Sequence, residues 1–178
     1  MEIGKEPLDY FQVLIDFVYD PIFARYLRKI AEQYKRDQIP EEIDIRPFIV
    51  DSLIFDTYIK RKTPLDYFIE KHKSVLSRPQ LKIYMDFKQA QLSAFKVIES
   101  ERPEKMILED LINNDRYLMK DSEAIKFLQK DRYAILRLIP FMEFYIPTGA
   151  CTIVNSDDEK VVIGLAKLLK VPPIFVEG

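Results

Sequence analysis

Cysteine, histidine and glycine are scarce in this chain of 178 residues, which has one cysteine, one histidine, four glycines and no tryptophan. A single cysteine cannot form an internal disulfide and fits a reducing compartment, so we expect a cytoplasmic protein. Tetrahedral zinc sites use four ligands, whereas Cys151 and His72 supply only two of the usual type. The glycines lie too far apart for a glycine-rich phosphate-binding loop. We therefore predict no cofactor and no zinc site.

Long apolar runs are also missing, and the charges nearly balance. No stretch approaches the roughly 18 apolar residues of a membrane span, and the first residues lack the basic-then-apolar layout of a signal peptide. The 27 basic and 29 acidic side chains give a net charge of −2, which does not fit a uniformly basic nucleic-acid binder. The chain has instead 48% apolar residues, enough for a sizeable core. Abundant Lys, Glu and Ile beside few glycines lean towards a thermophile.

The spacing of the apolar residues changes near residue 92. Before this point they recur every three or four positions, the period of a helix, and after it they alternate, the period of a strand. This predicts an α+β protein with an N-terminal helical domain (1–92), a small antiparallel β-barrel-like domain (93–155), and a C-terminal helix and tail (156–178). The expected helices cover residues 7–20, 21–35 and 46–60, begin again after Thr63 and after Ser77, and end with 159–169.

Short alternating segments separated by turn residues follow residue 92. The expected strands cover residues 93–99, 106–112, 116–120, 133–139, 141–145 and 150–154. We expect turns at 102–104, 113–115 and 147–149, and one helical turn near 124–128. Together these segments predict a small rolled sheet or barrel. The apolar tail 172–176 can add a strand to a sheet edge, in its own chain or in a neighbour's.

Two blocks of sequence resemble those of a known group of proteins. The first is DSLIFD at 51–56 followed by KTPLDYF at 62–68, and the second comprises residues 95–97, 108–111, 117–119 and 131–140. In this order and spacing, across residues 48–154, the chain resembles the helical block and small β domain of proteins that carry the SEC-C zinc motif. Their zinc-binding tail needs several cysteines, and this chain has only Cys151. The resemblance therefore implies the fold of that group without its metal site.

Paired carboxylates are the remaining candidates for metal or acid–base chemistry. Asp66 and Glu70 are four residues apart and share a helix face, whereas Asp51 and Asp56 diverge by about 140° around a helix. The acidic residues at 109–110 point to opposite faces if their segment is a strand. No pair forms a convincing cluster, so we assign none to a metal and expect solvated carboxylates or local ion pairs. A carboxylate-metal-dependent hydrolase stays open as the second alternative function.

The two residues best suited to nucleophilic or proton-transfer chemistry are isolated in the sequence. His72 lies between two lysines near the end of a helix, where the helix dipole favours a surface histidine, and catalysis would require an orienting partner. Cys151 lies in an apolar strand pattern, so we expect a buried, inert thiol. We therefore predict no catalytic residue and favour a role that is not enzymatic.

Basic and aromatic residues offer a binding surface. The candidates are Lys60, Arg61, Lys62, Tyr117, Phe141, Phe144 and Tyr145. We predict a non-catalytic binding or adaptor module with a protein partner and no membrane, and its oligomeric state stays open. The alternative is RNA or single-stranded nucleic acid, bound through the β domain and Lys60–Lys62 with the rings as stacking platforms. Phosphate affinity comes mainly from clustered cations, so the acidic balance favours the protein partner.

Overall fold

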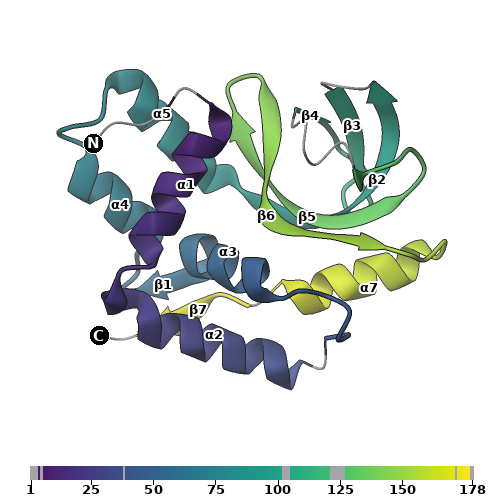
Figure 1. Cartoon of the computed structure of the whole chain (residues 1–178), viewed down its shortest axis with the longest axis horizontal. Helices are drawn as coiled ribbons and strands as arrows, with labels where there is room; N and C mark the ends of the chain where they lie inside the picture. The colour runs from purple at the N-terminus through teal and green to yellow at the C-terminus, as the bar shows by residue number, and fades with distance from the viewer. Residues whose placement is uncertain are drawn as a thin grey trace.

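Figure 1 shows a computed structural model of the chain, which describes residues 4, 6–37, 39–101, 105–120, 127–170 and 172–176, apart from the side chains of residues 100 and 101. The helices are α1 (Pro7–Val18), α2 (Ala24–Arg36), α3 (Arg46–Asp56), α4 (Pro64–His72), α5 (Arg78–Asp86) and α7 (Glu159–Leu169), with short 3₁₀ turns η1 (Pro21–Phe23) and η2 (Phe87–Gln89). The strands are β1 (Thr57–Ile59), β2 (Gln91–Glu101), β3 (Lys105–Asp110), β4 (Arg116–Met119), β5 (Tyr133–Phe141), β6 (Phe144–Val154) and β7 (Ile174–Val176). The predicted α+β class is therefore confirmed, and helices give way to the long strands between η2 and β2.

Helices α4 and α5 begin after Thr63 and Ser77, as predicted, and each has a capping side chain and a proline in its first turn. The Thr63 hydroxyl accepts a hydrogen bond from the Asp66 backbone N–H at 3.2 Å, while the Asp66 carboxylate accepts one from the Thr63 N–H at 2.9 Å. Ser77 and Gln80 form the same reciprocal pair at the start of α5. Helices that such local contacts start lie where the sequence predicts them. In the described part of the chain, no helix is long and apolar enough to cross a membrane.

Five strands close into a barrel in the order β2–β3–β4–β6–β5. Most neighbours are antiparallel, but β4 and β6 run parallel and meet at Met119 and Tyr145, so the sheet is mixed rather than wholly antiparallel as predicted. The reason is geometric, because strands cannot alternate in direction all the way around a ring with an odd number of members. The Lys120 backbone N–H donates to the Tyr145 carbonyl at 3.0 Å and extends this parallel contact.

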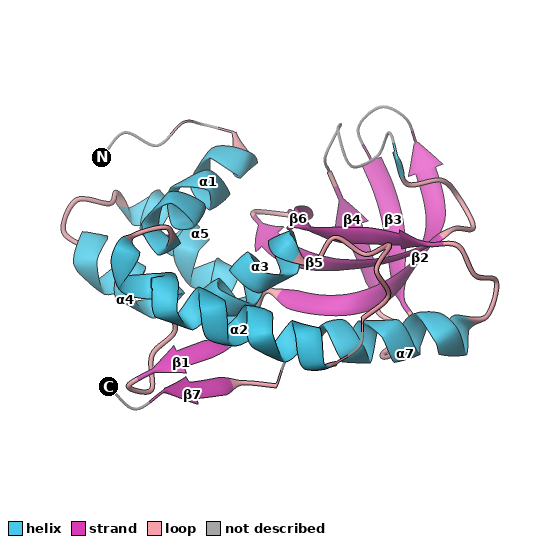
Figure 2. Cartoon of the chain, turned by 60° about the horizontal axis from the view of Figure 1, so that its bottom comes forward, coloured by secondary structure: helices cyan, strands magenta, loops and turns pink. Residues whose placement is uncertain are grey.

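Strand β5 is buried on both faces because it separates two apolar cores. Ala134, Leu136 and Leu138 fill the barrel interior, while the alternate residues Ile135 and Ile139 pack with the helices outside. Helix α3 packs on β6, and α7 packs on β2 and β5. Figures 1 and 2 show the pair β1–β7 on the side of α3 away from the barrel. The helical core is therefore continuous with the outer surface of the barrel.

The predicted strands 141–145 and 150–154 are wrong as separate strands, since β6 covers 144–154 without a break. The chain reverses between β5 and β6 at Met142, which has a φ of 56°. Pro147 lies inside β6 opposite Leu138, where the pairing register shifts. Proline lacks the N–H that a sheet ladder needs, and such an irregularity is where a sheet tolerates it. The proline-containing segment therefore marks a bulge rather than a turn.

The predicted helix 46–60 ends earlier, at Asp56, because the next residues form β1 and pair in parallel with β7. The Thr57 hydroxyl donates to the Ser52 carbonyl at 2.9 Å and closes the end of α3. β-branched and aromatic residues favour a strand once a partner strand is available. Here the partner is the tail, so the predicted strand addition occurs within the chain itself.

Two further predictions concern the ends of elements. The predicted helix 21–35 begins as the 3₁₀ turn η1 before α2 continues it. The predicted turn 102–104, and residues 124–126 of the predicted helical turn, lie outside the described residues.

Candidate functional site

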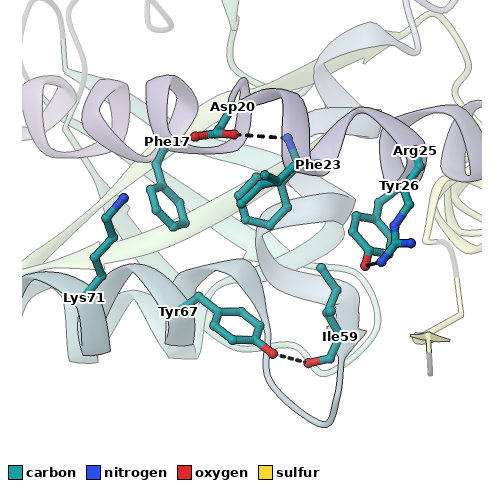
Figure 3. Close-up of a pocket in the computed structure, with 9 residues that line it drawn as sticks. Phe17, Asp20, Phe23, Arg25, Tyr26, Ile59, Tyr67 and Lys71 are labelled. Carbon is teal, nitrogen blue, oxygen red and sulfur yellow. Dashed lines mark hydrogen bonds between the residues drawn. The ribbon is translucent and has the colours of Figure 1, made fainter. Parts of the chain in front are cut away.

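A surface pocket of about 340 Å³ lies between α1, η1, α2, β1 and α4 (Figure 3). We name it the Phe23 pocket. Its aromatic and basic lining residues are Phe17, Phe23, Tyr26, Tyr67, Arg25 and Lys71. Its size falls at the lower end of the roughly 300–1,000 Å³ of typical ligand pockets. None of these six residues was among the binding residues predicted from the sequence, because their order along the chain does not reveal that they meet.

The turn between α1 and α2 shapes one wall of this pocket. The Asp20 carboxylate accepts a hydrogen bond from the Ile22 N–H at 3.0 Å, and Pro21 starts η1 directly after it. The turn buries Phe23 and leaves the Ile22 side chain 65% exposed. It therefore presents one apolar side chain to solvent at the edge of an apolar pocket.

Cations flank the aromatic rings of the Phe23 pocket. The Lys71 Nζ lies 5.5 Å from the ring centroid of Phe17, and the Arg25 guanidinium carbon lies 4.6 Å from that of Tyr26. The Arg25 guanidinium also donates to the Tyr26 hydroxyl. The pocket thus combines apolar ring surfaces with positive charge, an arrangement that suits an apolar group next to an acidic one.

The predicted basic run Lys60–Lys62 lies on an exposed turn between β1 and α4. Lys60 and Arg61 adopt left-handed backbone conformations, with φ values of 49° and 69°. The Lys62 Nζ lies 2.6 Å from the Glu70 carboxylate and 6.0 Å from the ring centroid of Tyr67. Lys62 therefore lies near Tyr67, which lines the Phe23 pocket, but is not itself one of the pocket's lining residues.

The four predicted binding aromatics lie on strands of the barrel, whereas Lys60–Lys62 lie on the turn after β1. Tyr117 and Tyr145 meet edge to face in the barrel core, with ring centroids 4.9 Å apart. Phe141 is buried, and its ring lies 5.7 Å from that of Phe144 beside the helical core. In Figures 1 and 2, β1 and the strands β3 and β4 lie at opposite ends of the molecule. Tyr117 and Phe141 are buried and so are not presented to a nucleic-acid base. Phe144 and Tyr145 are half-buried, and the Lys120 Nζ lies 4.8 Å from the ring centroid of Phe144.

A buried ion cluster joins α3 to the barrel. Arg137 lies on the helix-facing side of β5, and its side chain is 2% exposed. Its Nε lies 3.3 Å from the Asp51 Oδ2, and its terminal nitrogens pair with the Asp56 carboxylate. The Thr148 hydroxyl of β6 donates to the same Asp51 oxygen. Arg137 was not among the predicted residues, although a lone cation within the apolar run 133–139 is unusual.

Asp51 is almost completely buried, so the expectation of a solvated carboxylate is wrong for this residue. Asp51 and Asp56 do diverge around α3, but the long Arg137 side chain spans both. Burial raises the pKa of Asp51 to about 7, against the opposing effects of Arg137 and of the Thr148 hydrogen bond. One guanidinium thus faces two carboxylates, of which Asp51 is buried and Asp56 is 23% exposed.

Three of the other predicted carboxylates make the expected local or exposed contacts. Asp66 caps α4, Glu70 pairs with an exposed lysine, and Glu109 of β3 pairs with an arginine of β4. Asp110 is instead almost completely buried and accepts a hydrogen bond from the Ser93 hydroxyl at 2.8 Å, so the expectation of a solvated carboxylate is wrong for Asp110 as well. Among the described residues, no group of three or more Asp, Glu, His or Cys side chains is arranged to hold a metal ion.

His72 and Cys151 lie on different elements. The His72 ring packs on Phe68, with centroids 4.7 Å apart, and partial burial, followed by the charge of Lys71, lowers the pKa of His72. Cys151 is exposed on β6, so the predicted buried thiol is wrong. Because side chains alternate along a strand, the burial of Ala150 turns its neighbour Cys151 outwards.

The chain matches the model of a protein family over residues 23–170. That family is described as a family of unknown function, DUF7986. No curated protein and no solved structure matches the chain. The similarity to SEC-C motif proteins stays a prediction. Since the match extends from Phe23 through α7 and covers most of the sequence, the chain belongs to the DUF7986 family.

Proposed function

We propose that this member of a family of unknown function is a non-catalytic, cytoplasmic binding module whose Phe23 pocket takes an apolar side chain from an acidic segment of a partner protein. The observation that carries the proposal is the pairing of ring surfaces with cations, Phe17 with Lys71 and Tyr26 with Arg25. The acid that lines the pocket, Asp20, is bonded to a backbone N–H of η1. The charge offered to a partner is therefore mainly positive.

Ile22 extends the apolar surface beyond the pocket. A partner side chain that enters the pocket covers Ile22 as well, and burial of apolar surface contributes roughly 25 cal/mol per Å². Exposed charges at the edge of an interface add association rate and selectivity more than affinity. We therefore expect a reversible interaction that weakens as salt concentration rises.

Three synthetic peptides of equal length test the pocket. The first carries leucine and phenylalanine between glutamates, the second replaces the glutamates by lysines, and the third replaces the apolar residues by serines. In an NMR titration that follows the backbone amides of Ile22 and Lys71, we expect the first peptide to bind at least about tenfold more tightly than the others, a difference of about 1.4 kcal/mol. Equal affinities of the first two peptides would contradict the proposed charge preference.

A matched pair of variants tests the location. Ile22→Asp should lower the affinity for the acidic peptide at least about tenfold, because it places a carboxylate against the peptide's own charges. Val75→Asp is the control, because Val75 is 62% exposed, close to the 65% of Ile22, and does not line the pocket. Equal losses in both variants would show that the pocket is not the binding site. Octanoate completes the series: if it binds at Ile22 while no peptide does, the occupant is a small molecule and the protein partner is wrong.

A further inference from the structure

A second pocket, of about 350 Å³, lies on the opposite side of α1 from the Phe23 pocket. We name it the Asp51 pocket. Its apolar walls include Phe11 and Ile15 of α1 and Val50 of α3, and Asp51 also lines it. Ile15 and Phe17, which line the two pockets, are two residues apart and so point about 200° apart around the helix. The two pockets are therefore separate.

Asp51 combines deep burial with contacts from described residues that fall on one oxygen of its carboxylate. The residue is 2% exposed and lines the pocket. The Thr148 hydroxyl and the Arg137 Nε both approach Oδ2 of its carboxylate. No described residue donates a hydrogen bond to Oδ1. An acceptor of a residue that lines a pocket, with no donor among the described residues, is available to the donor of a ligand.

The charges that face Asp51 leave the cluster one cation short. Arg137 of β5 is its nearest cation, Asp56 of α3 shares that cation, and the Thr148 hydroxyl of β6 donates to Asp51. With both carboxylates ionised, one guanidinium faces two negative charges; Asp56 is 23% exposed and partly solvated, whereas Asp51 is not. Since an unpaired buried charge is strongly unfavourable, either a proton or a second cation must compensate it.

The mouth of the pocket does not supply this cation. Arg46 there is 86% exposed and pairs with Asp44 at 2.7 Å, so the two charges largely cancel. Gly149 of β6 completes the lining, and a Cβ added to it would meet the Pro47 Cβ at 3.8 Å, an ordinary contact. Apart from the Asp44–Arg46 pair at its mouth, Asp51 is thus the charged group that lines the pocket, and Gly149 offers a position from which to fill it.

We propose that the Asp51 pocket binds a small organic ammonium ion with a short apolar body, whose N–H group donates to the Asp51 Oδ1. The apolar walls hold the hydrocarbon, and the positive charge compensates Asp51 while Arg137 stays with Asp56. An alcohol of the same shape makes the apolar contacts with the pocket walls but lacks the positive charge that attracts Asp51. A carboxylate of the same shape is repelled by Asp51. The proposal uses residues that play no part in the Phe23 pocket, so it stands or falls independently of the proposed protein partner.

Butylammonium, butanol and butyrate are the probes that test this site. At about pH 8, where Asp51 is ionised, we expect butylammonium to shift the backbone amides of Val50 and Gly149 in an NMR titration and to raise the melting temperature, because a ligand that binds the native state stabilises it. Butanol and butyrate should bind at least about tenfold more weakly. At about pH 6.5, calorimetry in two buffers should show that butylammonium displaces a proton. Equal binding of butylammonium and butanol would overturn the proposal.

Two variants test separately the charge of Asp51 and the volume of the Asp51 pocket. Asp51→Asn keeps the shape and should abolish the preference for butylammonium over butanol. Gly149→Val should fill the pocket and remove binding of both probes, while Gly164→Val, where a new Cβ meets nothing within 4 Å, should leave it unchanged. If Asp51→Asn does not fold, the proposal is tested by comparing the binding of the three probes to the unaltered protein and to Gly149→Val. Butylammonium binding that survives Gly149→Val would place the site elsewhere and overturn the proposal.

Discussion

The two pockets on either side of α1 differ in where their charges lie. In the Phe23 pocket the cations Arg25 and Lys71 are exposed beside aromatic rings. In the Asp51 pocket the exposed charges of Asp44 and Arg46 pair with each other, and the remaining charged lining residue, Asp51, is buried against Arg137. Exposed charges contribute little to stability and are screened by salt. Buried charges require partners, and their loss is expensive. We therefore expect the first pocket to tolerate substitution and the second to be tied to the stability of the fold.

The largest expected effect is a pH dependence that originates in Asp51. Its pKa of about 7 in the folded state lies above its ordinary value of 3.8, so the native state holds this proton more tightly than the unfolded chain. The contribution to the free energy of unfolding is fully present below about pH 4 and is lost as the pH rises through about 7, a change on the order of 4 kcal/mol. Urea denaturation from about pH 4 to about pH 8 measures it.

Asp51→Asn is the control for this pH dependence. Its unfolding free energy should vary much less over the same range, because the titrating group is gone. His72 has a lowered pKa and acts with the opposite sign, losing stability as the pH falls, but it is present in both proteins and cancels in the difference. Parallel curves for the two proteins would show that Asp51 does not titrate in this range.

The next effect contrasts a buried ion pair with an exposed one. Asp56→Ala should lower the free energy of unfolding by about 3 kcal/mol, because it leaves the buried Arg137 guanidinium with one partner. Glu70→Ala is the matched change beside the Phe23 pocket, where Lys62 and Glu70 are 46% and 49% exposed. It should cost less than about 0.5 kcal/mol. Similar losses in the two variants would contradict the contrast between the pockets.

Two tyrosines give a smaller contrast of the same kind. The Tyr34 hydroxyl donates to the Leu169 carbonyl at 2.7 Å, and burial raises the pKa of Tyr34 to about 12, so it remains a donor at neutral pH. Tyr34→Phe leaves that buried carbonyl without this donor and should cost about 1.5 kcal/mol. Tyr67→Phe removes a half-buried bond to the Ile59 carbonyl and should cost about 0.5 kcal/mol. Denaturation of both variants under one set of conditions measures the difference.

The smallest expected effect on stability is that of Lys71→Ala, within about 0.5 kcal/mol, because Lys71 is an exposed cation.

Salt distinguishes the two binding sites. Between about 0.05 M and about 0.5 M ionic strength, the affinity for the acidic peptide should fall several-fold. The affinity for butylammonium should change little, because salt screens a buried charge poorly. A strong salt effect on both ligands would show that the Asp51 pocket is more open to water than its burial indicates.

The helix starts and the overall class could be predicted because their causes are local. Thr63 and Ser77 cap their helices through side chains three residues away, and the period of apolar residues reveals whether a segment is helix or strand. Cys151 and Asp51 could not be placed in this way. The apolar strand pattern around Cys151 predicts burial, and the helical pattern around Asp51 predicts a solvated carboxylate. The exposure of each side chain depends instead on which neighbouring element covers it.

The sequence by itself determined the α+β class, the capped helix starts and the position where helices give way to strands. Only the tertiary structure decided which charged and apolar groups meet: Arg137 reaches Asp56 across 81 positions of sequence, and Thr148 reaches Asp51 across 97. Secondary structure depends on interactions within a few residues, which periodicity records. Pockets, ion clusters and raised pKa values arise from burial by distant segments, and no pattern within a single segment contains that information.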